Sequence, residues 1–228
     1  MAHLTAWLGW LALGGLLAAG TLIFGFTPDD ALMGFSQKIM YMHVPVIWAA
    51  YVAFFIVFFC SIGYVWKRSA AMDRVARCAA EVGVVFCGLA LASGSLWGRP
   101  TWGTYWIWDA RLTTTLLLFL VYVGYGLLRR FAGPGEQAAR LAAVVGIVGF
   151  LDIPLIHVSV NWWRTLHQPS TLFKTSAEGA PKPALPFELL LPLLLSGVVV
   201  LVLLAFLLRA RLRLAQLTDQ VERRIAEG

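Results

Sequence analysis

Six long apolar runs constrain this chain more than any other feature of its sequence. Each satisfies the length of about 20 residues that an α-helix needs to cross roughly 30 Å of hydrocarbon. Backbone polar groups inside a bilayer must be satisfied within the protein, and 60% of the residues are hydrophobic against 13% charged. The first run lacks the positive segment of a secretory signal, so we interpret it as a membrane helix. We predict an all-α integral membrane protein, one membrane domain over 1–228, with six transmembrane helices near residues 7–26, 44–66, 78–97, 112–128, 141–163 and 185–208.

The positive charges lie in the connections between these runs, which indicates orientation and not nucleic-acid binding. A nucleic-acid site needs cations clustered on one face of a folded domain. Alternate connections carry twelve and six Lys and Arg, and the richer side faces the cytoplasm under the positive-inside rule. We therefore expect a multi-pass protein of the bacterial inner membrane with both termini cytoplasmic. The poorer, periplasmic side holds Lys38, Arg99, Arg111, Arg164, Lys174 and Lys182.

The second periplasmic connection, residues 97–113, is rich in tryptophan and reads WGRPTWGTYWIWDARLT. Interpreted as a helix from Thr101, it places one stripe of side chains at i, i+3, i+4 and i+7, namely Trp102, Tyr105, Trp106 and Asp109. Such a stripe can lie flat at the membrane surface. The alternative is an ordinary aromatic belt, because tryptophan favours headgroup depth in any membrane protein. A belt needs fewer tryptophans than this segment has.

Histidines are the candidate metal ligands, because neutral imidazole binds iron strongly. His3 is at the cytoplasmic terminus, His43 and His167 fall in periplasmic connections, and His157 lies at the outer end of the fifth run. Considered alone, His43 could be an interfacial histidine and His167 a loop histidine in water. The repeat H-V-x-V-x-W at 43–48 and 157–162 favours His157 as the partner of His43. The chain has no C-x-x-C-H, so any heme is held without thioether bonds, and its three cysteines are interpreted as buried small hydrophobes.

Three segments together resemble one known family: the tryptophan-rich connection, HVPVIW at 43–48 and WWRTLHQ at 162–168. That family comprises the heme-handling proteins of system I cytochrome c maturation that carry the tryptophan-rich WWD signature, and the chain is most similar to its heme exporter protein C members. The resemblance covers the chain from about Lys38 to Thr171. It implies that His43 and His167 are the axial ligands of heme b and that His157, which precedes the motif, is not one. His157 stays the alternative to His167 because of the repeat at 43–48 and 157–162. The chain departs from the family at Tyr105, where another tryptophan is frequent.

The resemblance also gives the aromatic side chains a role. A porphyrin is a flat apolar disc with two carboxylates at one edge, which stacking rings and rim cations complement. We expect Arg99 and Arg111 to bind the propionates, and Asp109 to orient Arg111 or a partner protein. The rings expected to contact heme are those of Trp97, Trp102, Tyr105, Trp106 and Trp108.

The implied function is presentation of heme to a periplasmic heme chaperone. The implied partners are that chaperone, an ABC-type ATPase with its membrane subunits, and a small single-helix membrane subunit. No Walker A sequence occurs in the chain, so ATP hydrolysis belongs to a partner. We expect a heme-delivery subunit and not an enzyme, one that assists covalent attachment of heme to the chaperone. One alternative is a b-type cytochrome subunit of a quinone-linked membrane oxidoreductase, which normally buries histidine pairs inside the bundle, and another is a permease.

Asp152 and the tail at 209–228 each have two interpretations. Asp152 lies eleven residues into the fifth run, and an intramembrane acid is a functional candidate by default. We favour instead a hydrogen bond to a neighbouring helix or to backbone freed by Pro154. The tail has the pattern of an amphipathic helix, which binds either membrane lipid or a cytoplasmic subunit.

Overall fold

The computed structural model describes residues 2–133, 135–163, 165–167, 173–175, 181–183 and 186–227. Arg164 and residues 168–171 of the family motif lie outside this part of the chain. The described elements, in chain order, are α1 (Ala2–Thr21), η1 (Leu22–Phe26), η2 (Phe35–Ile39), α2 (Met40–Lys67), α3 (Ala70–Trp102), α4 (Ala110–Phe131), α5 (Glu136–Phe150), α6 (Asp152–Trp162), β1 (Phe173–Thr175), β2 (Pro181–Pro183) and α7 (Phe187–Glu227). Among these described residues, six helical segments are long and apolar enough to cross a membrane, which confirms the predicted fold class.

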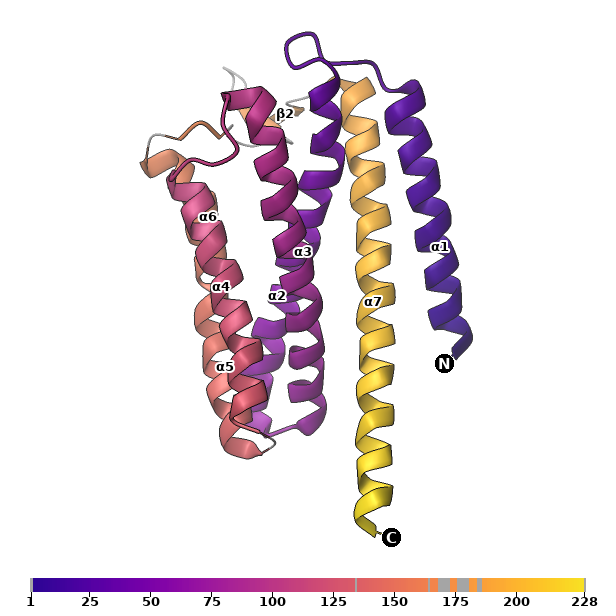
Figure 1. Cartoon of the computed structure of the whole chain (residues 1–228), viewed down its shortest axis with the longest axis vertical. Helices are drawn as coiled ribbons and strands as arrows, with labels where there is room; N and C mark the ends of the chain where they lie inside the picture. The colour runs from indigo at the N-terminus through magenta and orange to yellow at the C-terminus, as the bar shows by residue number, and fades with distance from the viewer. Residues whose placement is uncertain are drawn as a thin grey trace.

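The helices form a bundle with α2 and α3 at its centre (Figure 1). Helix α2 packs against α3, α5 and α7, and α4 packs against α3, α5 and α6. Helix α1 packs on α7 at the edge of the molecule. Residues 27–39, 103–109, 163 and 165–167 lie at one end of the bundle, which we call the loop end, whereas both termini lie toward the other (Figure 1). The antiparallel pair of β1 and β2 lies at the loop end too.

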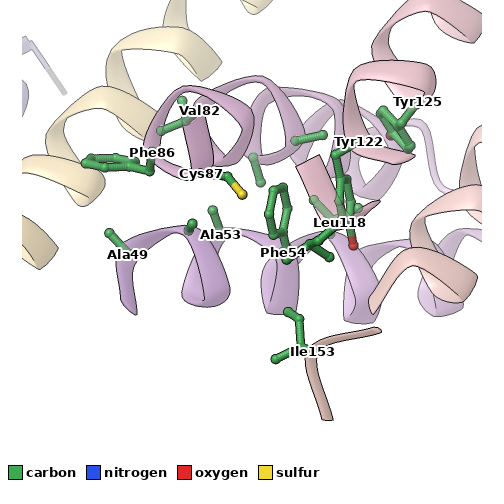
Figure 2. Packing of buried hydrophobic residues seen from close by; sticks show 14 of the residues in the cluster. Ala49, Ala53, Phe54, Val82, Phe86, Cys87, Leu118, Tyr122, Tyr125 and Ile153 are labelled. Carbon is green, nitrogen blue, oxygen red and sulfur yellow. The ribbon is translucent and has the colours of Figure 1, made fainter. Parts of the chain in front are cut away.

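Small residues let the central helices approach closely. Ala49 and Ala53 of α2 are fully buried against α3, and a Cβ at Gly83 of α3 would lie 2.6 Å from the ring of Phe54. The Phe54 ring stacks on Tyr122 of α4 with centroids 3.7 Å apart (Figure 2). The Tyr122 hydroxyl donates to the carbonyl of Gly146 in α5 at 3.0 Å. One buried cluster therefore joins α2, α3, α4 and α5.

The fifth predicted run, 141–163, is divided into α5 and α6 at Leu151. Pro154 has no N–H, and its ring clashes with the carbonyl four residues earlier, which belongs to Phe150. The chain tightens at this point, and the Leu151 N–H bonds to the Val148 carbonyl at 3.1 Å. The break matters for the site, because α6 leads directly into the segment with His167.

Helix α7 continues the last membrane span into the predicted tail without interruption. Its 41 residues extend about 60 Å at 1.5 Å per residue, well past the other helices (Figure 1). Arg211 pairs with Glu81 of α3, and Arg74 of α3 pairs with Asp219 at 2.7 Å. These ion pairs attach the beginning of the tail to α3. An exposed apolar stripe follows along the tail, made of Leu214, Leu217, Val221 and Ile225.

Candidate functional site

The tryptophan-rich segment is not a helix from Thr101, so that prediction is wrong. Helix α3 ends at Trp102, and Gly103 has a φ of 80°, a left-handed conformation that favours glycine. Helix α4 begins only after Asp109, whose side chain accepts a hydrogen bond from the Leu112 N–H. The predicted stripe is therefore split between the end of α3 and a non-helical loop over 103–109.

The loop folds back over the end of α3. Ser95 donates to the carbonyl of Tyr105 at 2.8 Å, and the Arg99 side chain donates to the carbonyl of Gly103. The Arg99 guanidinium also lies 5.6 Å from the centre of the Tyr105 ring. A Cβ at Gly98 would lie 3.2 Å from the Thr104 carbonyl oxygen, so a glycine there lets the loop sit against the helix. The predicted propionate ligand Arg99 thus already holds the loop in place.

His43 lies near the start of α2 and faces α3. Its Nδ1 is 3.1 Å from the carbonyl oxygen of Ala90 and 3.2 Å from Oγ of Ser93. A carbonyl only accepts, so Nδ1 is assigned the proton, and the lone pair lies on Nε2. The ring is 5.9 Å from that of Trp97. A Cβ at Gly94 would lie only 2.8 Å from Cε1 of the imidazole, so the absence of a side chain there makes room for the histidine.

His167 is held by Asp109, 58 residues earlier in the chain. The distance from its Nδ1 to Oδ2 of Asp109 is 2.7 Å, and the Thr165 hydroxyl also donates to this oxygen. The other oxygen, Oδ1, caps α4 through Leu112. One carboxylate therefore fixes both the start of α4 and the orientation of the imidazole. The edge of the His167 ring meets Trp102, with centroids 4.6 Å apart.

The ionisation of this pair leaves the imidazole neutral. Burial lowers the pKa of His167, and the hydrogen bond and negative charge of Asp109 reverse only part of that effect. Burial raises the pKa of Asp109, but hydrogen bonds from Thr165, the Leu112 N–H and His167 outweigh it and bring the pKa below its usual value. The contact is therefore a hydrogen bond from a neutral imidazole to a carboxylate. Nδ1 of His167 carries the proton, and Nε2 again has the free lone pair.

His43 and His167 lie close enough to interact electrostatically. His43 lies within electrostatic reach of His167 and of Arg111 in the first turn of α4. His157 is placed differently: its Nδ1 bonds to the Ile153 carbonyl of its own helix at 2.9 Å, and its ring lies 5.3 Å from Tyr51. His167 thus lies within electrostatic reach of His43, whereas the His157 ring lies beside Tyr51.

The remaining aromatic residues surround the histidines at different depths. Trp106 and Trp108 meet edge to face, with centroids 5.5 Å apart. Tyr105 and Trp108 are 56% and 76% exposed and so form the outer rim. The indole N–H groups of Trp97 and Trp106 are buried, and neither has a hydrogen-bond partner within the described ranges. Two donors are therefore available to a ligand or to water in this site.

Several residues of the site were not predicted. The sequence analysis missed Ala90, Ser93 and Gly94 around His43, since nothing in a local pattern reveals contacts across 47 and more residues. Thr165 carried a weak signal, because it lies two positions before His167. We expected Asp109 to orient Arg111 or a partner, and its hydrogen bond to His167 was missed. The favoured hydrogen bond of Asp152, to a neighbouring helix or to the backbone freed by Pro154, is wrong, because neither carboxylate oxygen has a partner in the part of the chain that is described.

Comparisons with known proteins agree on one family. The family model for heme exporter protein C matches residues 1–227. Heme exporter protein C of Bradyrhizobium diazoefficiens is 42% identical over 221 residues, 95% of this chain and 80% of the relative. The Escherichia coli K12 protein of the same name is 40% identical over 196 residues, 84% of this chain and 80% of the relative. A mitochondrial protein of Arabidopsis thaliana, named as ccmC-like in cytochrome c biosynthesis, is 31% identical over 210 residues, 89% of this chain and 77% of the relative. The chain therefore belongs to the heme exporter protein C family of the cytochrome c biogenesis system.

Proposed function

We propose that this membrane protein binds heme b at the loop end through Nε2 of His43 and Nε2 of His167, and presents it to a periplasmic heme chaperone. In this proposal the loop end faces the periplasm, both termini are cytoplasmic, and the membrane is the bacterial inner membrane. The partners are an ABC-type ATPase with its membrane subunits and a small single-helix membrane subunit. The membership of the heme exporter family supports heme as the cargo.

The observation that carries the proposal is that both imidazoles have a hydrogen-bond acceptor at Nδ1, which leaves Nε2 of each ring free to bind a metal. Each has its Nδ1 engaged by an acceptor, the Ala90 carbonyl for His43 and the Asp109 carboxylate for His167. An acceptor on one ring nitrogen fixes the tautomer, orients the ring and increases the basicity of the other nitrogen. Both Nε2 atoms are therefore prepared to donate a lone pair to iron, and the lowered pKa of His167 keeps that lone pair free of a proton at neutral pH.

The surroundings fit a porphyrin. Trp97 and Trp102 contact the rings of His43 and His167, so apolar surface lies beside each proposed ligand. Arg111 lies within electrostatic reach of both histidines and is proposed to pair with a propionate. The unpartnered indole N–H of Trp106, or that of Trp97, can donate to the second propionate. A heme would supply iron with two open axial positions, which is the chemistry that two neutral imidazoles complement.

Presentation to a chaperone is supported by the exposed rim. Tyr105 and Trp108 are large aromatic residues left open in a loop that is braced on α3, as a docking surface requires. His167 sits in a non-helical segment and is held by side-chain hydrogen bonds, so it can leave the iron without moving a helix. We therefore propose His167 as the ligand that is released on transfer.

The test is absorption spectroscopy of the purified protein loaded with heme. His43→Ala and His167→Ala should each lose the low-spin spectrum of bis-histidine heme, and added imidazole should restore it by filling the vacant axial position. His157→Ala is the matched control and should stay six-coordinate without imidazole. If His157→Ala shows the defect that imidazole repairs and His167→Ala looks like the wild type, the ligand pair is His43 with His157.

A further inference from the structure

Asp152 is an acid inside the membrane that the heme site does not use. It begins α6 directly after the break at Leu151, about 15 Å below Trp162 at the loop end and about 24 Å from Glu136 at the other end, at 1.5 Å per residue. Both carboxylate oxygens are buried, and neither has a hydrogen-bond partner among the residues described. The protein therefore leaves a strongly polar group unsatisfied at a depth where lipid offers no partner.

The two forms of such a carboxyl differ greatly in cost. An isolated carboxylate in a medium of low polarity is very unfavourable, whereas the neutral acid loses only the hydrogen bonds it fails to make. The neutral acid offers one O–H donor and acceptor oxygens, which internal water can satisfy. The burial of both oxygens therefore favours the protonated acid, with water bound to it, over the ionised carboxylate.

Polar and titratable side chains converge near Asp152 from several helices. Tyr51 of α2 lies within electrostatic reach of Asp152, of Cys87 on α3 and of Arg111 on α4. His157 of α6 contacts the Tyr51 ring at 5.3 Å. Helix α5 contributes only apolar residues and glycine from 141 to 150. Figure 2 shows Cys87 of α3 pointing toward α2, beside Ala53 and Phe54. Below His43 and His167, these side chains therefore provide polar groups near Asp152 that can hydrogen-bond to water or to the proton of the acid.

We propose that Asp152 is an intramembrane proton-binding site that binds internal water at the α5–α6 break, and that loss of this proton loosens α6. Helix α6 packs mainly on α4 and meets α5 only at the break, so the continuous backbone ladder of a single span does not hold it. An ionised Asp152 draws more water to the break than the neutral acid does. Cys87 of α3 is fully buried in the intact bundle and lies within electrostatic reach of Asp152, so we expect separation of α6 from its neighbours to give water and reagents a path to this thiol.

Infrared spectroscopy of the full-length protein in bilayers tests the proton. The wild type should show a carboxylic-acid C=O band at about pH 5, where an ordinary aspartate is ionised, and D2O should shift that band. Asp152→Asn should abolish the band, and Asp152→Glu should move it. Glu188→Gln, which removes an exposed acid at the start of α7, is the control and should leave it unchanged. A wild-type spectrum without a band that depends on Asp152 would overturn the proposal.

Alkylation of Cys87 tests the loosening, in a background where Cys60 and Cys78 are serine. The rate is compared between Asp152 and Asp152→Asn proteins at each pH, which removes the part of the thiol titration that both proteins share. The negative charge of an ionised Asp152 disfavours the nearby thiolate, so it can only lower the ratio and cannot produce the expected rise. We expect a ratio near one where the acid band is present and a rise of about tenfold or more where alkaline pH removes the band. A ratio that stays near one after the band has gone would refute the link between the proton and α6. Neither measurement needs heme, so the outcome is independent of the proposed function.

Discussion

Replacing Asp109 by asparagine separates the two tasks of one carboxylate. Oδ1 caps α4 by accepting from the Leu112 N–H at 2.8 Å, and an asparagine oxygen can do the same. Oδ2 accepts from Nδ1 of His167 at 2.7 Å and from the Thr165 hydroxyl. In Asp109→Asn the amide NH2 takes the place of Oδ2, so a donor faces two donors. The helix start is preserved while the imidazole loses its acceptor.

The size of the effect follows from the kind of hydrogen bond that is lost. Hydrogen bonds to a charged group contribute about 1.5–3 kcal/mol, and a factor of ten in affinity corresponds to about 1.4 kcal/mol. Removal of the acceptor behind a histidine ligand typically lowers metal affinity by about 10–100-fold. We expect heme affinity to fall within that range. Protonation of His167 does not explain such a loss, because Asp109 raises the pKa of His167 and its removal leaves the imidazole still more neutral.

Heme titration followed by absorption measures this loss, and thermal unfolding measures the cap. Asp109→Asn should lose only the stability contributed by the hydrogen bonds to Oδ2, whereas Asp109→Ala should lose about a further 1 kcal/mol because the cap is gone. Imidazole added in excess should restore the spectrum of Asp109→Asn. If the Asn variant binds heme within about twofold of the wild type, the carboxylate does not orient the ligand, and the reasoning that connects Oδ2 to His167 fails.

Three further predictions use other features of the structure. Gly94→Ala should weaken heme binding by about tenfold or more, because its Cβ would lie 2.8 Å from Cε1 of His43. Gly124→Ala is the control and should bind heme normally, because its Cβ would meet nothing within 4 Å. Equal heme affinities of the two variants would refute the packing argument. The pKa of His167 is lower in the folded protein than in the unfolded chain, so the unfolded chain binds the proton first as the pH falls through about 6.5. The free energy of unfolding is therefore not reduced by this group above that pH, and it decreases as the pH falls further. Melting temperatures measured as a function of pH should fall below about pH 6.5 in the wild type and fall less steeply in His167→Gln. Reporters that are active only in the periplasm should be active when fused after Pro28 or Gly103, at the loop end, and inactive when fused after Arg68 or Gly133, at the other end. The reverse pattern would contradict the proposed orientation.

The six spans could be predicted because hydrophobic length is a local property of the sequence. The ends of the helices could not. Helix α3 begins at Ala70, eight residues before the predicted start, because charged residues in its first turns are satisfied by other helices. Asp73 pairs with Arg129 of α4 at 2.6 Å, and Arg74 pairs with Asp219 of α7. Such partners lie far away in sequence, so no local pattern indicates that the helix continues.

The site could be predicted only as a set of residue types. The motifs indicated His43, His167 and the tryptophans, yet the helical stripe was wrong, because Gly103 and Asp109 are end signals that override the spacing of the aromatic residues. The acceptors of the histidines lie 47 and 58 residues from them, one of them a backbone carbonyl that carries no sequence signal. Their identity depends on how α2, α3 and α4 pack, which the sequence does not show directly.

The way in which each histidine is held gives the two proposed ligands different mobility. His43 belongs to α2, whose buried face packs on α3 through Ala49, Ala53 and Phe54, so moving its backbone would expose several buried side chains. In a bilayer the cost of that movement is the loss of close van der Waals packing between the helices. His167 can move once the hydrogen bonds with Asp109 and Thr165 break, and the cap of α4 on Oδ1 is unaffected. The energetic difference therefore favours exchange at His167 over exchange at His43. A heme bound in this way would stay on His43 of α2 while His167 is released to make way for a receiving protein.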